Sequence, residues 1–237
     1  MRYEYARRPD LYDLEYSFKD YEAEVERIEA IVRARNPDAR TLLDVACGTG
    51  RHLEALRQRF ETVEGVDADE GMLAVARERL PGVALHVGDM RTFELGHEFD
   101  AVTCLFSSIG FAQDLEQLGG AAQRLAAHLA PGGVLVVEPW ITPDEWRPSK
   151  PHVLSAEGDG VVLARVTVSG RDGRLATMEM HYALGTPDGI ETWDRDHALA
   201  LYTVDEMRTA FEHAGLEVEH DPEGLMGRGL YICTRAA

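Results

Sequence analysis

Leu42-Leu43-Asp44-Val45-Ala46-Cys47-Gly48-Thr49-Gly50 is an apolar segment that runs into a turn containing two glycines. This pattern predicts a buried strand over 41–45, then a tight turn, then a helix that begins near Arg51. The two glycines permit a close approach between the backbone and a ligand, because they carry no Cβ. Asp67, nineteen positions after Gly48, ends the next predicted strand. A carboxylate there can accept hydrogen bonds from both hydroxyls of a ribose, so the sequence predicts an adenosine pocket.

The spacing of the glycines indicates which adenosine cofactor the pocket takes. A dinucleotide fingerprint places a third glycine at position 53, where this chain has Leu53. The pattern therefore leans away from NAD. Asp44, Gly48 and Gly50 instead resemble the D-x-x-x-G-x-G motif I of class I S-adenosylmethionine-dependent methyltransferases, whose loop holds methionine in place of pyrophosphate.

Composition narrows the class of protein. The length of 237 residues, 45% of them hydrophobic, predicts one globular domain with room for a subdomain. With no long apolar run and no leader, we expect a soluble cytoplasmic protein and no membrane partner. The net charge of −18 argues against nucleic acid as a partner. The cysteines form no C-x-x-C pair and the histidines have no ligand spacing, so we expect buried reduced thiols and no metal.

Strand and helix patterns alternate through the first part of the chain, as in βαβ units with a parallel sheet. After a helix that starts near Ala23 and stops before Asn36-Pro37, we expect strands at 41–45, 62–66, 83–87, 100–105 and 133–138 and helices at 51–59, 70–79 and 114–129. The pattern returns near the C-terminus with a helix after the capping box at 203–206 and strands near 216–220 and 229–234. The predicted fold is α/β, with a doubly wound and mostly parallel sheet.

Between these parts, four prolines over 139–151 predict an irregular connection. Three strands then follow at 161–168, 175–184 and 190–201, joined by glycine turns, which predicts a small inserted antiparallel sheet. We therefore expect a core made of 1–140 and 202–237, with an N-terminal lid over about 1–22. The insertion, 141–201, is expected to cover the active site.

Several residues after strand ends are candidates for cofactor binding. Asp67 is the expected ribose acceptor, with a solvated loop acid as the bland alternative. Asp89 can accept from the adenine amine and Met90 can lie against the ring, although a plain turn would also use Gly88-Asp89. Met72 is compatible with the core or with a wall of the cofactor pocket.

Residues after the fourth and fifth strands are candidates for binding the acceptor. Ser107 and Ser108 can hydrogen-bond a polar acceptor or form a local turn. Trp140 is compatible with a wall for the acceptor or with a packed cover. Arg228 lies between two glycines, where it can approach an anion or remain a surface charge.

Taken together, these motifs resemble the S-adenosylmethionine-dependent N,N-dimethyltransferases of TDP-linked amino sugars, which make dimethylamino sugars such as desosamine and mycaminose for macrolide antibiotics. The resemblance runs over most of the chain. Its more discriminating pieces are Phe106-Ser107-Ser108-Ile109-Gly110, Glu138-Pro139-Trp140 and Gly227-Arg228-Gly229-Leu230. Family members often carry a histidine directly after the first of these pieces, where this chain has Phe111.

The resemblance implies roles for particular residues. Tyr12 is expected beside the transferring methyl group and the sugar amine. The implied acceptor contacts are Tyr16, Ser107, Ser108, Phe111, Trp140 and Arg228. The implied cofactor contacts are Tyr21, Ala46, Gly48, Gly50, Asp67, Ala68, Met72, Asp89, Met90 and Phe106. The resemblance also makes a homodimer possible.

Two other functions stay open at this point. One is an O- or N-methyltransferase of an unrelated small metabolite. The other is a module that binds S-adenosylmethionine without turnover. An acidic chain must provide local positive charge for an anionic nucleotide, and Arg228 is the first candidate, followed by Arg147, Lys150 and Arg165.

Overall fold

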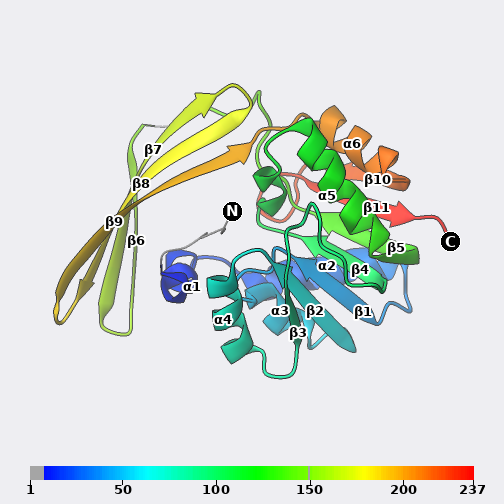
Figure 1. Ribbon diagram of the computed structural model, residues 1–237, viewed down its shortest axis with the longest axis horizontal. Coiled ribbons are helices and arrows are strands. Elements are labelled where there is room, and N and C mark those ends of the chain that lie inside the picture. Colours follow the sequence, from blue (N-terminus) through cyan, green and yellow to red (C-terminus); the bar gives the residue numbers. More distant parts are fainter. Residues whose placement is uncertain (1–7, 149) are drawn as a thin grey trace.

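The computed structural model describes residues 8–148 and 150–237, which form two β-sheets with helices packed on the larger one (Figure 1). The larger sheet has seven strands in the order β10-β11-β5-β4-β1-β2-β3, and the smaller has four in the order β6-β7-β8-β9. In the larger sheet β11 runs antiparallel to both of its neighbours, β10 and β5, and the other pairings are parallel, whereas the smaller sheet is wholly antiparallel. The predicted fold class is confirmed.

The strands of the larger sheet are β1 (Thr41–Val45), β2 (Thr62–Asp67), β3 (Ala84–Val87), β4 (Phe99–Cys104), β5 (Leu129–Val137), β10 (Leu216–Asp221) and β11 (Leu230–Arg235). The helices are α1 (Tyr12–Glu15), α2 (Tyr21–Arg35), α3 (Arg51–Leu56), α4 (Glu70–Arg79), α5 (Leu115–Ala127) and α6 (Val204–His213). Short 3₁₀ turns cover Pro9–Leu11 and Ser108–Phe111.

Polar side chains fix where the longer helices begin, because the first N–H groups of a helix have no partner within it. Asp20, Asp69 and Asp114 each accept from backbone N–H groups at the start of α2, α4 and α5. The predicted capping box of α6 is present: Glu206 N–H donates to Thr203 Oγ1 at 3.1 Å, and Thr203 N–H donates to Glu206 Oε2 at 2.9 Å.

Two hydrophobic layers hold the larger sheet. Leu42 of β1 packs on the side that carries α2, α3 and α4, and the adjacent Leu43 packs on the side that carries α5 and α6. Both are fully buried. Because successive side chains of a strand point to opposite faces, a continuous apolar strand such as β1 requires cover on both faces. With both faces covered by helices, the sheet remains accessible to a ligand at the carboxyl ends of its parallel strands, where ligands of such folds bind.

The inserted sheet differs from expectation by one strand. Its members are β6 (His152–Gly158), β7 (Val161–Asp172), β8 (Leu175–Thr186) and β9 (Gly189–Ala200), so the expectation of three strands was wrong. The missed strand, β6, lies at the edge of the sheet, and its residues alternate between exposed and half-buried. A strand with no fully buried side chain has a weak apolar pattern. The boundaries predicted for the insertion, 141 and 201, stay a prediction.

The first part of the predicted lid, residues 1–7, lies outside the described residues. The described part forms the 3₁₀ turn and the single turn of α1, which the sequence pattern did not predict. Figure 1 places α1 between the four-stranded sheet and the helices of the core. The same segment contacts both, since Pro9–Leu11 packs near α4 and α1 packs near β6.

Candidate functional site

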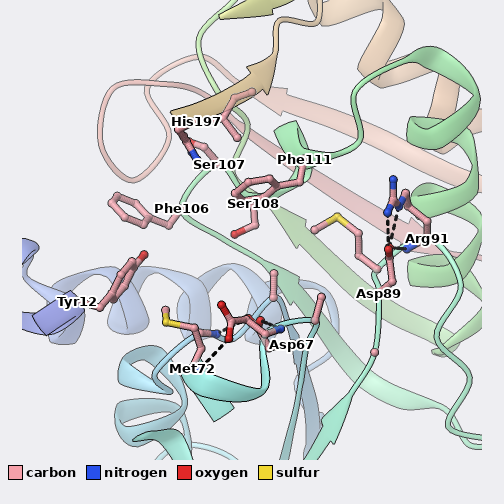
Figure 2. Close-up of a pocket in the computed structure, with 17 residues that line it drawn as sticks. Tyr12, Asp67, Met72, Asp89, Arg91, Phe106, Ser107, Ser108, Phe111 and His197 are labelled. Carbon is pink, nitrogen blue, oxygen red and sulfur yellow. Dashed lines mark hydrogen bonds and ion pairs between the residues drawn. The ribbon is translucent and has the colours of Figure 1, made fainter. Parts of the chain in front are cut away.

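A pocket opens where β1, β2 and β4 end, and many of the predicted residues surround it (Figure 2). The predicted residues that line it are Tyr12, Ala46, Gly48, Asp67, Ala68, Met72, Asp89, Met90, Phe106, Ser107, Ser108 and Phe111. Residues to which the sequence analysis gave no role in the site also line it, namely Asp69, Gly88, Arg91, His197 and Leu199. A smaller polar pocket adjoins it and is lined by Tyr21, Asp44, Thr49, Arg51 and His52 among others.

The glycine turn forms one wall. Ala46, Gly48 and Gly50 have φ values of +61°, +57° and +78°, in the left-handed region that favours glycine. A Cβ at Gly48 would come within 3.4 Å of Met72 Cε, so Gly48 keeps this wall open. Gly50 does not line either pocket; a Cβ there would come within 2.6 Å of Leu80 Cδ1. Gly50 therefore packs against α4 and its C-terminal end.

Asp67 lies directly against this turn. Its Oδ2 accepts from Gly48 N–H and its Oδ1 accepts from Asp69 N–H, each at 2.8 Å. Burial raises the pKa of Asp67 from its ordinary 3.8 to about 6, while the two N–H bonds act in the opposite direction. Each carboxylate oxygen has lone pairs beyond these bonds. The side chain is therefore oriented by the backbone and still able to accept from a ribose.

Asp89 is held by its near neighbour Arg91. Arg91 Nε and the Arg91 backbone N–H donate to Asp89 Oδ1 at 2.8 and 2.9 Å, and Arg91 Nη2 pairs with Oδ2. Arg91 also donates to Gln117 Oε1 at 2.6 Å. Asp89 thus faces the pocket as half of an ion pair, and the assignment of the adenine amine to it stays a prediction.

Met72 has the features of both interpretations, a core residue and a wall of the pocket. It is 2% exposed, as a core residue is, and it also lines the pocket. Met90 and Ala68 line the same region. These side chains offer apolar surface beside Asp67 and Asp89, which suits an aromatic base between polar groups.

The loop after β4 carries unusual backbone geometry. Phe106 and Ser107 have φ values of +51° and +64°, and neither is a glycine. Two polar contacts hold the loop: Glu138 Oε2 accepts from Phe106 N–H at 2.7 Å, and Ser107 Oγ donates to Pro139 O at 2.9 Å. Such conformations cost of order 1–3 kcal/mol and persist where surrounding contacts fix them. Phe106 and Ser107 consequently face the pocket together.

Arg228 lies behind this loop. Its Nη1 donates to Ser107 Oγ at 3.1 Å, and its guanidinium lies 4.7 Å from the ring centre of Trp140 and 5.6 Å from that of Phe106. Burial lowers the pKa of Arg228 below its ordinary value. Across the part of the chain that the structure describes, Arg228 has no carboxylate within ion-pair distance. Neither Arg228 nor Trp140 lines the pocket itself.

The aromatic residues of the lid meet the same loop. Tyr12 lines both pockets, and its ring centre lies 4.7 Å from that of Tyr16. Tyr16 lies 5.0 Å from the ring of Phe106 and outside the pocket lining. Tyr21 lines only the polar pocket. The structure thus brings Tyr12 to the junction of the two pockets and places Tyr16 behind it.

His197 is a pocket residue that the sequence analysis missed. It extends from β9 of the inserted sheet, and its ring centre lies 5.2 Å from that of Phe111. Burial, with Arg195 and Arg165 nearby, lowers the pKa of His197 to about 3, so the imidazole is neutral at ordinary pH. The sequence does not predict this position, because a single histidine in a strand forms no motif that indicates a site.

In residues 8–148 and 150–237, no three His, Cys, Asp or Glu side chains gather in a way that would hold a metal. No helix in the same ranges has both the length and the apolar character needed to cross a bilayer.

Comparison with known proteins agrees with the geometry. A family model described as a methyltransferase domain matches residues 42–133. An N,N-dimethyltransferase of dTDP-3-amino-3,6-dideoxy-alpha-D-glucopyranose from Streptomyces fradiae is 45% identical over 225 residues, covering 94% of this chain and 88% of the relative. The crystal structure of Streptomyces venezuelae DesVI superposes with a TM-score of 0.93 at 42% identity, covering 98% of this chain and 99% of DesVI.

A second solved structure shows a relative with its cofactor. It is SAM-bound CalS10, an amino pentose methyltransferase from Micromonospora echinaspora involved in calicheamicin biosynthesis. It has a TM-score of 0.88 at 42% identity and covers 95% of this chain and 97% of CalS10. The full-length similarity and the pocket at the glycine turn lead to one conclusion. The chain belongs to the family of N,N-dimethyltransferases of dTDP-linked amino sugars.

Proposed function

We propose that the protein transfers methyl groups from S-adenosylmethionine to the amine of a TDP-linked deoxyamino sugar and yields the N,N-dimethylated sugar. Three relatives that carry such names are 38–45% identical over nearly the full chain. The observation that carries the choice of acceptor is Arg228, a half-buried cation beside the pocket loop. In a chain with a net charge of −18, a half-buried cation with no ion-pair partner among the described residues suits an anionic nucleotide sugar.

The residues of the larger pocket fit S-adenosylmethionine. The left-handed turn at Ala46 and Gly48 leaves space beside Met72, Asp67 is oriented to accept from a ribose, and Met90 and Ala68 add apolar surface. We assign the amino-acid end of the cofactor to the polar pocket near Tyr21 and Arg51. The cofactor supplies an electrophilic methyl group on a positively charged sulfur.

The reaction requires the protein mainly to align the reacting atoms and to keep water away from them. The neutral amine nitrogen attacks the methyl carbon, the carbon–sulfur bond breaks with its electron pair left on sulfur, and the new ammonium loses a proton to water. Placing the reacting atoms in line in a water-poor site can supply ~7 to 11 kcal/mol of the barrier. Tyr12 and Phe106 line both pockets and Phe111 lines the larger one, so their rings should limit the access of water to the reacting atoms.

Tyr12 orients the amine through its phenol oxygen and is not an obligatory base. Tyr12→Phe should then slow turnover about tenfold or less, because one hydrogen bond is worth about 0.5–1.5 kcal/mol. Steady-state kinetics with a TDP-amino sugar measure this. Complete loss of turnover with unchanged binding of S-adenosylhomocysteine would contradict the orienting role.

Arg228 provides the test of the acceptor class. Arg228→Ala should raise the KM for a TDP-amino sugar about tenfold or more, since charge-assisted hydrogen bonds contribute about 1.5–3 kcal/mol. It should leave the affinity for S-adenosylhomocysteine unchanged. Arg57→Ala is the matched control, because Arg57 is exposed at the end of α3. If thymidine diphosphate does not compete with the acceptor, a methyltransferase of another small metabolite is the better description.

We further propose that the enzyme works as a cytoplasmic homodimer, without nucleic-acid or membrane partners. The outer face of the inserted sheet supports the dimer, since Val153, Val162, Val166 and Val168 are exposed there as an apolar patch. All three cysteines are buried and free, as suits a reducing compartment. The negative net charge disfavours phosphate backbones and anionic lipid surfaces.

A further inference from the structure

The single turn α1 is held from two sides, and its four residues point in different directions. An isolated helical turn is unstable in water, so its contacts must hold it in place. Tyr12 points into the pocket, as Figure 2 shows. Leu14 packs in the hydrophobic cluster of the inserted sheet with Leu163 and Trp193. Asp13 and Glu15 reach in separate directions to polar partners.

Asp13 anchors α1 to the glycine turn. Its Oδ1 accepts from Thr49 Oγ1 at 2.6 Å, and its Oδ2 pairs with Arg79 of α4. Arg79 also donates to Thr49 O at 2.5 Å. Thr49 lies between Gly48 and Gly50 and is 2% exposed. The loop expected to hold the cofactor and the carboxylate next to Tyr12 therefore share one polar cluster.

Glu15 anchors the same turn to the inserted sheet. Its Oε1 pairs with Arg165 of β7 and accepts from the phenol of Tyr182 of β8 at 3.2 Å. The side chains of Glu15 and Arg165 are 6% and 12% exposed. Breaking a buried pair by removing one partner is costly, because the remaining charge stays desolvated. This anchor is accordingly a strong constraint on α1.

We propose that α1 couples the two binding steps: Asp13 and Glu15 are positioning residues that fix Tyr12 only when both anchors are made. This inference rests on the proposed function, because it takes the inserted sheet to be the acceptor side. A ligand that orders the glycine turn strengthens the Asp13 anchor. A ligand that orders the inserted sheet strengthens the Glu15 anchor. Each ligand stabilises the docked state of α1 for the other, so the coupling is favourable and reciprocal.

The experiment measures this coupling with two probes, S-adenosylhomocysteine and thymidine diphosphate. Calorimetry gives the Kd of each probe with and without a saturating amount of the other. In the wild-type protein we expect each probe to lower the Kd of the other about fivefold or more, the lower end of typical coupling. A factor of one with both probes bound would overturn the inference while leaving the proposed function intact.

Asp13→Asn and Glu15→Gln should each reduce the coupling factor to about one. The affinity for each probe alone should change much less. The double variant should lose no more than either single variant, because both anchors act through one helical turn. Asp10→Asn is the matched control and should keep the wild-type factor, since Asp10 is exposed and pairs only with Arg8 among the described residues. Retained coupling in Asp13→Asn or Glu15→Gln would overturn the inference.

A second pair of variants covers the case in which Asp13→Asn does not fold. Thr49→Val removes the hydroxyl that donates to Asp13, and Thr49→Ser keeps it. Thr49→Ser should retain the coupling and Thr49→Val should lose it. The same behaviour in both variants would contradict the Asp13 anchor.

A separate outcome concerns the acceptor class. If thymidine diphosphate does not bind at all, the proposed nucleotide acceptor is wrong and hydrogen exchange decides the inference by itself. Adding S-adenosylhomocysteine should then slow amide exchange in β7 around Arg165 in the wild type and not in Asp13→Asn. Unchanged exchange in the wild-type β7 would overturn the coupling.

Discussion

At the scale of single residues, the carboxylate of Asp67 is expected to set a pH limit on cofactor binding. Its pKa is raised to about 6 by burial, and a protonated carboxyl accepts hydrogen bonds poorly. We expect the affinity for S-adenosylhomocysteine to fall by up to about tenfold per pH unit below pH 6. Asp67→Asn should weaken binding at pH 7.5 and remove most of this pH dependence, as measured by calorimetry from pH 5 to 8. Asp38→Asn, an exposed control, should retain it.

The raised pKa of Asp67 also affects the stability of the cofactor-free protein. Lower pH should weaken cofactor binding but stabilise the fold through this group. The folded-state pKa of Asp67 is above its ordinary 3.8, so the folded state binds more protons between pH 4 and 6. The contribution of this group to the free energy of unfolding is therefore lowest above pH 6 and rises as the pH falls toward 4. Asp67→Asn should flatten that part of the stability profile in urea unfolding. A steeper profile in the variant would show the opposite linkage.

At the scale of elements, Gly50 is predicted to act in packing between α3 and α4. Alanine at Gly50 must adopt a φ of +78° and place its Cβ within 2.6 Å of Leu80 Cδ1. Gly96 offers a matched control, because its φ is +77° and no atom lies within 4 Å of the added Cβ. Gly96→Ala should lose about 1–2 kcal/mol from the backbone alone. Gly50→Ala should lose clearly more, as measured by urea unfolding, and equal losses would contradict the packing role.

The helices and strands differ in how well the sequence predicts them. Strands β1 and β2 and helix α5 follow from local apolar periodicity, glycine turns and caps, which are encoded within a few residues. The edge strand β6 has no such pattern, because none of its side chains is fully buried. The turn α1 was also missed. One helical turn is too short to show a period, and distant partners hold it.

Some residues of the candidate site can be predicted from the sequence, and others become apparent only in the folded chain. Gly48 and Asp67 follow from motif spacing, since the turn and the strand end are local. His197 enters the pocket because β9 crosses back over the loop at Phe111, which only the folded chain reveals. The ion pair between Asp89 and Arg91 was within reach of the sequence, as they are two residues apart, yet an adjacent arginine is also common in plain turns.

At the scale of the whole molecule, the apolar face of the inserted sheet should control assembly. Val166 is 42% exposed and pairs across the sheet with Val153, which is 65% exposed. Val166→Lys should shift the protein toward the monomer, because a charge at the centre of an apolar interface is desolvated at a cost. Light scattering after size-exclusion chromatography measures the mass. Val87→Lys, at an exposed valine of β3, should leave the mass unchanged.

The placement of the indole rings has a practical consequence for spectroscopy. The three tryptophans of the chain lie in the inserted sheet or pack beside it: Trp193 stacks on Tyr182, Trp146 donates to Gly170 O at 3.2 Å, and the ring centre of Trp140 lies 4.7 Å from the Arg228 guanidinium. None of the three lines the larger pocket. Intrinsic tryptophan emission should therefore report, without a label, on ligands that reach the inserted sheet, and a stopped-flow trace would time that step.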